Sequence, residues 1–363
     1  MALIVPRCPG RASIGPLADG TSGDRLTILP VTRLVYINRA KRIQPLSLCD
    51  HSALLSYGRK SPTIPGNQSE TKGRDDQMGM METGVRVLRP EGFKRMAYTQ
   101  WGSPDAREVV ICVHGLTRQG RDFDALADHL ATDLGCRVVC PDVLGRGKSD
   151  WLADPSGYSY PLYLADMAAL IARSGAEQVD WVGTSMGGLI GLMLAATPNS
   201  PIRRLVINDI GPLVPWEGLA RIGGYVGEDP LFTNREAAEH RLKERIVTYG
   251  PMPPERWSGF VEHSLRRVAE GWRLAYDPAI AQAFQAVQPG QPIDLWALWD
   301  RVEVPVLVIR GADSDLLPAS VVEEMKRRGP GCQAVEVPGA GHAPWLMSAD
   351  QIAPVAEFLK GHG

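Results

Sequence analysis

From about residue 82 onward, short apolar runs alternate with segments in which apolar residues recur every three or four positions. The first pattern is typical of buried strands and the second of amphipathic helices, so the alternation predicts a mostly parallel sheet covered by helices, an α/β fold. Strands are expected at residues 94–101, 109–113, 138–140, 179–182, 205–208, 306–309 and 334–337, and helices at 122–133, 162–172, 186–196 and 352–359.

Strand patterns are missing between residue 211 and about residue 300, and helical patterns take their place. This interruption predicts a helical cap at residues 212–300, inserted into a core formed by residues 82–211 and 301–363. Open α/β sheets bind ligands beyond the carboxyl ends of their strands, so the cap is expected to cover the binding site. The expected cap helices are 235–247, 255–270 and 278–287, and the cap tryptophans are Trp216, Trp257, Trp272, Trp296 and Trp299.

Residues 1–77 differ in character from the rest of the chain. Prolines and glycines recur in this segment, neither the helical nor the strand period persists, and 11 Lys or Arg residues stand against 6 Asp or Glu. Three interpretations remain open: a disordered extension, an organellar transit peptide, or residues upstream of a true start at Met78, Met80 or Met81.

Composition excludes several classes of protein. A formal net charge of −2 gives no general case for nucleic-acid binding. No run approaches the roughly 20 apolar residues of a membrane span, so stable membrane insertion is not expected. The six cysteines show no C-x-x-C spacing and no metal-ligand cluster stands out, which predicts reduced thiols, no metal and no cofactor. A cytoplasmic protein is expected, or an organellar one if residues 1–77 are a transit peptide, and the sequence is compatible with a homodimer.

The sharpest chemical signal is Gly183-Thr184-Ser185-Met186-Gly187, a G-x-S-x-G motif between an expected strand and an expected helix. A serine hydroxyl is a poor nucleophile until it is held in place and its proton is removed. The motif predicts a tight turn that lifts Ser185 above the sheet, with glycines where side chains would clash.

Two further loops supply groups that such a nucleophile needs. Gly339-Ala-Gly-His342-Ala-Pro344 follows the last expected strand, and His342 is the expected general base. His114-Gly115-Leu116 ends an earlier strand, and the amides of Leu116 and Met186 are the expected oxyanion donors. His114 and Gly115 are also expected to contact the substrate.

The segment Gly145-Arg-Gly147-Lys-Ser149 hints at a phosphate-binding loop. The phosphate-loop pattern requires a glycine five residues before its second glycine, and that position is Asp142. A loop that shapes the rim of the pocket is the preferred interpretation.

Together these motifs resemble the α/β-hydrolase fold superfamily over residues 82–363, in the order His114-Gly115, Asp142 to Ser149, Gly183 to Gly187, and Gly341-His342. The resemblance implies a carboxylate partner for His342. Most of the superfamily carries it three residues past a glycine after the penultimate strand, but here that residue is Ser314, flanked by Asp313 and Asp315. A minority of esterase-like members place it after the preceding strand, which favours Asp209, with Asp315 and then Asp313 as alternatives.

The resemblance implies a serine hydrolase that cleaves the ester, or a related acyl bond, of a small apolar or aromatic substrate through an acyl-enzyme. Trp216 and Trp345 are the expected aromatic contacts of that small-molecule ester. Ser185 argues against relatives that use an aspartate nucleophile. A lactonase, a carbon–carbon bond hydrolase, a perhydrolase or an acyltransferase remains open on the same residues. A ligand-binding protein without catalysis, or a lipase anchored to membranes by residues 1–77, is the rival of another kind.

Overall fold

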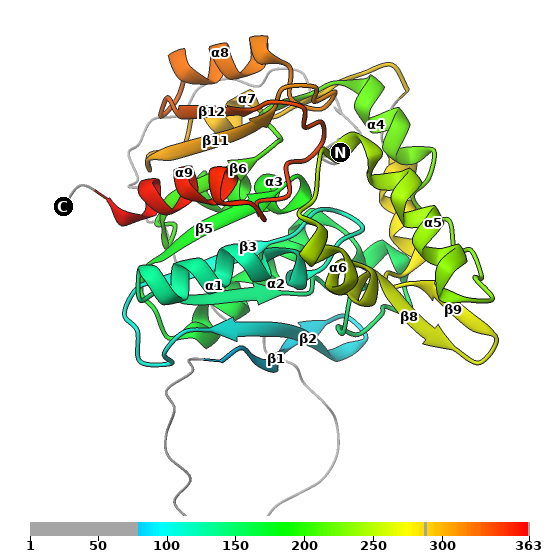
Figure 1. The fold of residues 1–363 in the computed structure, drawn as a ribbon. Helices are drawn as coiled ribbons and strands as arrows, with labels where there is room; N and C mark the ends of the chain where they lie inside the picture. Colours follow the sequence, from blue (N-terminus) through cyan, green and yellow to red (C-terminus); the bar gives the residue numbers. More distant parts are fainter. Residues whose placement is uncertain (1–78, 287–288, 362–363) are drawn as a thin grey trace, which may run out of the picture. The chain divides into compact units, whose positions relative to one another are not determined.

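The computed structural model describes residues 79–286 and 289–361, so the predictions for residues 1–77 lie outside the described chain. Eight strands form one sheet in the order β1-β2-β4-β3-β5-β6-β11-β12 (Figure 1). The pairs β1–β2 and β2–β4 are antiparallel, and all other neighbours are parallel. The predicted fold class is therefore confirmed. The strands are β1 (Met81–Arg89), β2 (Gly92–Trp101), β3 (Val109–Val113), β4 (Arg137–Pro141), β5 (Val179–Thr184), β6 (Ile202–Asn208), β11 (Val306–Gly311) and β12 (Gln333–Val337).

Helices cover both faces of this sheet. Helices α1 and α9 lie in front of it in Figure 1, and α2 and α3 lie behind it. The helices that flank the sheet are α1 (Asp124–Asp133), α2 (Tyr160–Ser174), α3 (Met186–Ala195), α8 (Ala319–Arg327) and α9 (Ala349–Lys360).

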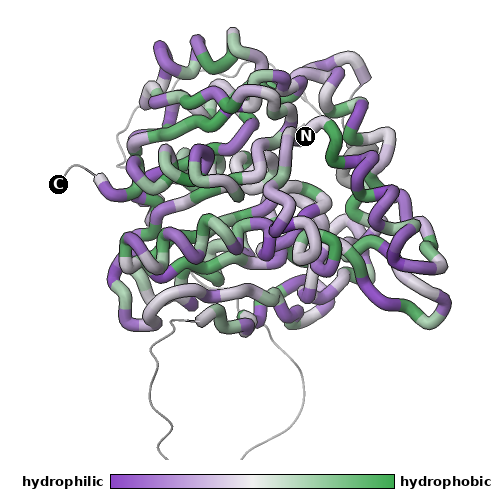
Figure 2. Tube along the Cα trace, viewed as in Figure 1, coloured by the Kyte–Doolittle hydropathy of each residue, from purple (hydrophilic) through white to green (hydrophobic). Residues whose placement is uncertain are grey.

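The middle of the sheet is the hydrophobic core. All five residues of β3 are buried, as expected for a central parallel strand covered on both faces. Figure 2 shows the hydrophobic residues concentrated along the inner strands. The fully buried Trp181 of β5 donates from Nε1 to the Gly187 carbonyl at 3.0 Å, and a Cβ at Gly191 would lie only 2.4 Å from that Nε1. These close contacts hold α3 against β5, and the turn between the two carries Ser185.

Residues 213–299 lie between β6 and β11, where the sequence predicts a cap. The loop Gly145–Gly147 contacts this segment, because the Gly147 amide donates to Ala275 and the Asp277 amide donates to Gly145. The elements of the segment are β7 (Leu213–Val214), α4 (Trp216–Gly223), α5 (Arg235–Ile246), α6 (Trp257–Ser264), β8 (Leu265–Val268), β9 (Gly271–Leu274), the 3-10 helix η5 (Pro278–Ala286), β10 (Ile293–Asp294) and α7 (Trp296–Trp299).

The predicted helix at 255–270 is wrong in its second half. Helix α6 ends at Ser264, and the chain continues as the β8–β9 hairpin, in which Leu265 pairs with Leu274. Both leucines are buried, so the hairpin gains apolar burial that a continued helix would have to find elsewhere. The segment predicted as a helix at 278–287 is a 3-10 helix. Strand β1 and helices α4 and α8 were not predicted.

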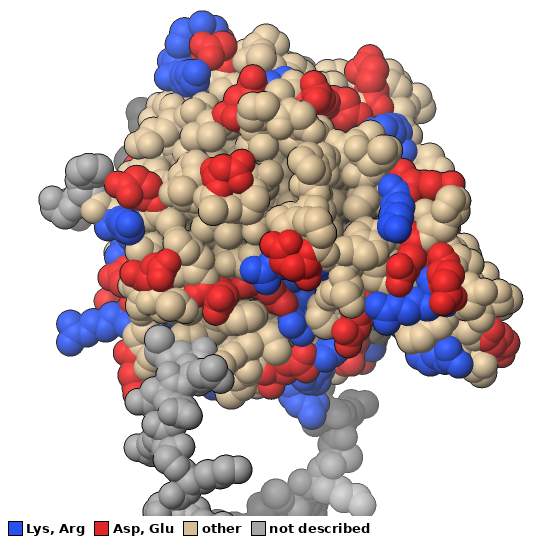
Figure 3. Space-filling model, viewed as in Figure 1, with Lys and Arg blue, Asp and Glu red and all other residues tan. Residues whose placement is uncertain are grey.

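The charged side chains on one face and the cysteines of the described chain bear on the remaining predictions. Figure 3 shows basic and acidic side chains interspersed on the face that it draws. Cys112, Cys136, Cys140 and Cys332 are free thiols. Among the described residues, no helix has both the length and the apolar character that a membrane span requires, and no three metal-ligating side chains gather in one place.

Candidate active site

Ser185 stands in a tight turn between β5 and α3, and its backbone has a positive φ of 53°. A Cβ on Gly183 would lie 2.2 Å from the Gly187 carbonyl oxygen, and a Cβ on Gly187 would lie 1.9 Å from the Val113 carbonyl oxygen. Only glycine fits such close approaches of backbone to backbone. The Ser185 amide donates to the Asn208 carbonyl at 2.9 Å, which ties the turn to β6.

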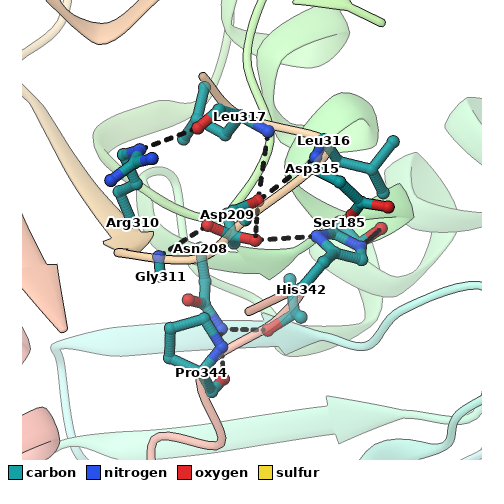
Figure 4. Close-up of polar contacts among 12 residues, drawn as sticks. Ser185, Asn208, Asp209, Arg310, Gly311, Asp315, Leu316, Leu317, His342 and Pro344 are labelled. Carbon is teal, nitrogen blue, oxygen red and sulfur yellow. Dashed lines mark hydrogen bonds and ion pairs between the residues drawn. The ribbon is translucent and has the colours of Figure 1, made fainter. Parts of the chain in front are cut away.

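His342 lies in the loop after β12 and faces both Ser185 and Asp209 (Figure 4). Its Nε2 is 2.8 Å from the Ser185 Oγ, and its Nδ1 is 2.8 Å from Oδ2 of Asp209. A carboxylate only accepts hydrogen bonds, so Nδ1 carries the hydrogen and Nε2 is left to accept from the hydroxyl. Asn208 donates to the Pro344 carbonyl at 2.8 Å and so ties the histidine loop to β6.

Asp209 follows β6 directly and is fully buried, with a positive φ of 58°. Besides the His342 contact, its oxygens accept from the Gly311 amide at 2.7 Å and from the Ser314 hydroxyl at 2.6 Å. Three donors therefore converge on one carboxylate, two from the end of β11 and its following loop and one from the histidine loop, and charge-assisted hydrogen bonds of this kind are the strong ones. Ser314, at the position where most of the superfamily places the acid, here donates to Asp209 instead.

The two alternative acids lie elsewhere. Asp313 and Asp315 are exposed, and neither makes a hydrogen bond to His342. Asp315 forms two hydrogen bonds with Arg221 of α4, at 2.5 and 2.8 Å. Partial burial acts to raise the pKa of the Asp315 carboxyl, but the Arg221 guanidinium outweighs it and holds that pKa below its usual value. Of the three aspartates considered, the structure brings only Asp209 to the histidine.

The loop that carries Leu116 is held by the ring of His114, which is fully buried. Nδ1 lies 2.7 Å from the Gly115 carbonyl oxygen, and Nε2 lies 2.9 Å from the amide nitrogen of Val143. The Val143 amide can only donate, so Nε2 accepts and Nδ1 carries the hydrogen. Both ring nitrogens are thus used within the protein, so neither is free to hydrogen-bond to a substrate, although His114 lines a cavity beside Ser185.

The peptide between Gly115 and Leu116 is oriented by these contacts. The Arg118 amide also donates to the Gly115 carbonyl, at 3.1 Å, and the Leu116 N–H points opposite to that carbonyl across the planar peptide. Within the described chain, the amides of Leu116 and Met186 donate to no protein acceptor. Both amides are therefore free to bind an oxygen of a ligand.

Burial lowers the pKa of His114 to about 3, and the nearby Arg146 and Arg118 guanidiniums act in the same direction. The unfolded histidine, with a pKa near 6.5, takes up a proton at a pH where the folded one does not. This contribution to stability is therefore complete above pH 6.5 and is lost as the pH falls toward 3. We expect the free energy of unfolding to fall by about 2 kcal/mol more in the native protein than in His114→Asn between pH 7.5 and pH 5.

Urea unfolding of both proteins at the two pH values measures this difference. Asp142 and Asp166, whose burial raises their pKa values to about 6 and about 7, titrate in the opposite sense. Both carboxyls are present in the native protein and in the variant, so their contributions cancel in the comparison. An equal loss of stability in the two proteins would contradict the neutral, buried state of His114.

Arg146 lies behind the Leu116 loop as a fully buried cation. Its Nε donates to the Leu116 carbonyl at 2.8 Å, and its Nη2 lies 3.7 Å from the Sδ of Met186. In the described chain no carboxylate lies within 4.0 Å of this guanidinium. Carbonyl and hydroxyl oxygens and the rings of Tyr158 and Tyr163 surround this charge in place of a carboxylate. It lies beside both residues that are expected to supply oxyanion donors. The loop 145–149 lines neither cavity that contains Ser185, so the structure gives its expected place at the pocket rim no support.

Ser185 lies where two cavities meet. The larger, of about 340 Å³, is mostly apolar, and the smaller, of about 50 Å³, contains His342. Ser185, Leu116 and Ile222 line both. The apolar side chains of the larger cavity are Leu116, Met186, Leu189, Ile210, Val214, Leu219, Ile222, Ile293 and Leu316, and its hydroxyl-bearing side chains are Ser156, Tyr158, Ser159, Tyr160, Tyr163 and Ser185.

Of the other residues expected to contact the substrate, two line a cavity at Ser185 and one does not. Gly115 and Trp345 line the smaller cavity, and Trp345 packs edge-on against Phe260 of α6. Trp216 lines neither cavity, so the structure gives its expected substrate contact no support. Arg118 also lines the smaller cavity, and sequence reasoning missed it although it lies only four residues past His114.

The chain belongs to the α/β-hydrolase family, because the model of the family described as "Alpha/beta hydrolase family" matches residues 110–357. Among its relatives, a 3-hydroxybutyrate-oligomer hydrolase from Cupriavidus necator is 46% identical over 286 residues, which cover 76% of this chain and 97% of the relative. A 2-(acetamidomethylene)succinate hydrolase from Mesorhizobium japonicum is 28% identical over 236 residues, which cover 64% of this chain and 81% of the relative.

Solved structures agree with this family. An α/β hydrolase from Novosphingobium aromaticivorans is 36% identical and aligns with a TM-score of 0.68, covering 77% of this chain and 98% of its own. The expectation of an enzyme of the hydrolase class is confirmed.

Proposed function

We propose that this hydrolase is a serine esterase that cleaves short oligomers of a hydroxy acid of the 3-hydroxybutyrate type, through an acyl-enzyme on Ser185. The observation that carries the proposal is the hydrogen-bonded series from Ser185 through His342 to Asp209, which opens into two cavities. The relative from Cupriavidus necator supports the substrate class, because it is 46% identical over nearly its whole length.

In the first half of the reaction, Nε2 of His342 takes the proton of the Ser185 hydroxyl while the oxygen attacks the ester carbonyl. Asp209 holds the ring by its Nδ1 hydrogen and stabilises the imidazolium that forms. The oxygen of the tetrahedral intermediate accepts from the Leu116 and Met186 amides, beside the charge of Arg146. His342 then gives its proton to the leaving alkoxide, and an alcohol departs from the acyl-enzyme.

In the second half, water takes the place of the alcohol. His342 removes a proton from the water, whose oxygen attacks the acyl carbonyl, and the same two amides hold the new oxyanion. Ser185 leaves with the proton returned by His342, and the carboxylic acid is released. Each proton that leaves a reacting oxygen returns to another, so the enzyme ends unchanged.

The larger cavity suits the acyl part of such a substrate. Its volume of about 340 Å³ falls within the range typical of small-molecule sites, and its wall is mostly apolar, with hydroxyl groups on one side. Burial raises the pKa of the Tyr160 hydroxyl, so this group stays neutral and can donate or accept. A hydroxyacyl chain offers methyl groups to the apolar wall and oxygens to these hydroxyls.

Hydrolysis of a linear 3-hydroxybutyrate trimer by the full chain tests the proposal. We expect monomer and dimer to appear, as followed by chromatography, alongside hydrolysis of p-nitrophenyl butanoate. Cleavage of the nitrophenyl ester without cleavage of the trimer would reject the oligoester class but retain an esterase. Turnover of neither ester, together with no fluorophosphonate adduct on Ser185, would favour a ligand-binding protein.

A further inference from the structure

In the proposed mechanism, the alcohol leaves on the side of the smaller cavity. His342, which must give its proton to the leaving oxygen, lines the smaller cavity and is absent from the lining of the larger one. The leaving group of the proposed substrate is therefore expected in the smaller cavity, and the acyl group in the larger. In an oligomer of a 3-hydroxy acid, the last leaving unit is itself an acid, whose carboxylate carbon lies three bonds from the ester oxygen.

An ion pair lines this same cavity, formed by Arg118 and Asp122. Of the described residues around it, Arg118 is the one lysine or arginine, and about 14% of its side-chain surface is exposed. A carboxylate that close to the ester oxygen must lie within a few ångströms of Ser185 and His342. Arg118 lines the same small cavity as Ser185 and His342, which makes it the candidate partner of that carboxylate.

The guanidinium of Arg118 is held in position with donors to spare. Nε and Nη2 donate to the two oxygens of Asp122 at 2.7 and 2.5 Å, and Nη1 donates to the Ser264 hydroxyl at 3.0 Å. The Phe260 ring packs against it, with its centroid 4.3 Å from Cζ. A guanidinium has five N–H groups, so one on each terminal nitrogen remains without an acceptor in the described chain.

Asp122 also explains how the cation persists when the cavity is empty. Burial acts to lower the pKa of Arg118, but the adjacent Asp122 carboxylate outweighs it, and the pKa is raised overall. The paired carboxylate fixes the plane of the guanidinium, so little rotamer freedom is left to lose when a ligand binds. Arginine in such a fixed fork is well suited to a carboxylate.

We propose that Arg118 binds the free carboxylate of the hydroxy acid leaving group, so that the smaller cavity is the subsite for the carboxyl-terminal unit of the oligomer. This inference rests on the proposed function. It means that the enzyme removes one unit at a time from the carboxyl end, because only the last unit carries a free carboxylate beside the scissile ester. An oligomer blocked at its hydroxyl end remains a substrate, and one blocked at its carboxyl end becomes a poor one.

The test compares the 3-hydroxybutyrate dimer with its methyl ester, in which the terminal carboxyl group is uncharged and carries a methyl group. Both are assayed at the ester between the two units. In the native enzyme we expect kcat/KM to be higher for the free acid. In Arg118→Met we expect that value to fall roughly 10- to 100-fold for the free acid, and by less than about threefold for the methyl ester. Arg118→Lys retains the charge and is expected to restore part of the preference.

Arg221→Met is the matched control, because Arg221 is another arginine paired with an aspartate but lines neither cavity. It should leave the ratio of the two kcat/KM values unchanged. An equal loss on both dimers in Arg118→Met would overturn the proposal, since it would mark Arg118 as a structural residue. A native enzyme that prefers the methyl ester would overturn it without any variant. Failure to cleave either dimer would instead reject the proposed substrate class, and the subsite with it.

Discussion

Replacing Ser185 by alanine is expected to reduce kcat for ester hydrolysis by about 10⁵- to 10⁶-fold, because no acyl-enzyme can form without the hydroxyl. The Oγ lies 2.8 Å from the Nε2 of His342, so loss of the hydroxyl removes the nucleophile and leaves His342 without a proton to accept. The residual rate would come from the Leu116 and Met186 amides and from binding alone. Initial rates with p-nitrophenyl butanoate and with the trimer measure the effect.

The control is Ser320→Ala, which removes an exposed hydroxyl on α8 far from any role in the proposed reaction. It should react at the native rate. The two variants should also differ in labelling, with a fluorophosphonate adduct found on the native protein and on Ser320→Ala but not on Ser185→Ala. Near-native turnover by Ser185→Ala would mean that the nucleophile is another group.

Replacing Asp209 by asparagine is expected to lower kcat by roughly 10⁴-fold, with little change in KM. An amide at this position can donate to Nδ1, which favours the tautomer of His342 with hydrogen on Nε2. That tautomer cannot accept the proton of Ser185. The same replacement at Asp315 should change kcat by less than about threefold, since Asp315 pairs with Arg221 and not with His342.

Steady-state kinetics of both variants at one pH decide between the two aspartates. Unfolding midpoints should accompany them, because Asp209 is fully buried and its replacement also disturbs Gly311 and Ser314. A large kcat loss in Asp315→Asn together with a small one in Asp209→Asn would assign the acid to the loop after β11. In that case the contacts drawn in Figure 4 would not describe the working enzyme.

Features that depend on short stretches of sequence could be predicted. Buried strands such as β3 and β5 are read from unbroken apolar runs, and the turn at Ser185 from glycines that no side chain could replace. The hairpin β8–β9 could not be predicted from its sequence. It depends on the pairing of Leu265 with Leu274, and the charged residues between these two leucines also fit a helix. Strand β1 was missed for a similar reason: it lies at the sheet edge and only part of it is buried.

Within the site, Ser185 and His342 can be predicted from local sequence motifs, whereas the residues that hold them in place cannot. Asp209 was preferred over Asp315 only by likeness to a minority of the superfamily, since three loops must come together before any carboxylate meets His342. Ser314 could be seen only as a residue out of place. Arg118 had no sequence signal, and Arg146 stood out only as part of the segment 145–149, because the importance of both lies in what they contact across the fold.

In the proposed mechanism the acid partner of His342 directly follows β6, so the loop of residues 312–318 carries no charge that the reaction needs. Leu316 of this loop lines the larger cavity, and Gly218 of α4 packs so closely on it that a Cβ there would lie 2.4 Å from its Cδ2. Side chains at this position can therefore alter which acyl groups are accommodated while the proton path stays intact. Substitutions in this short segment are therefore expected to change which esters bind without changing the residues that cleave them.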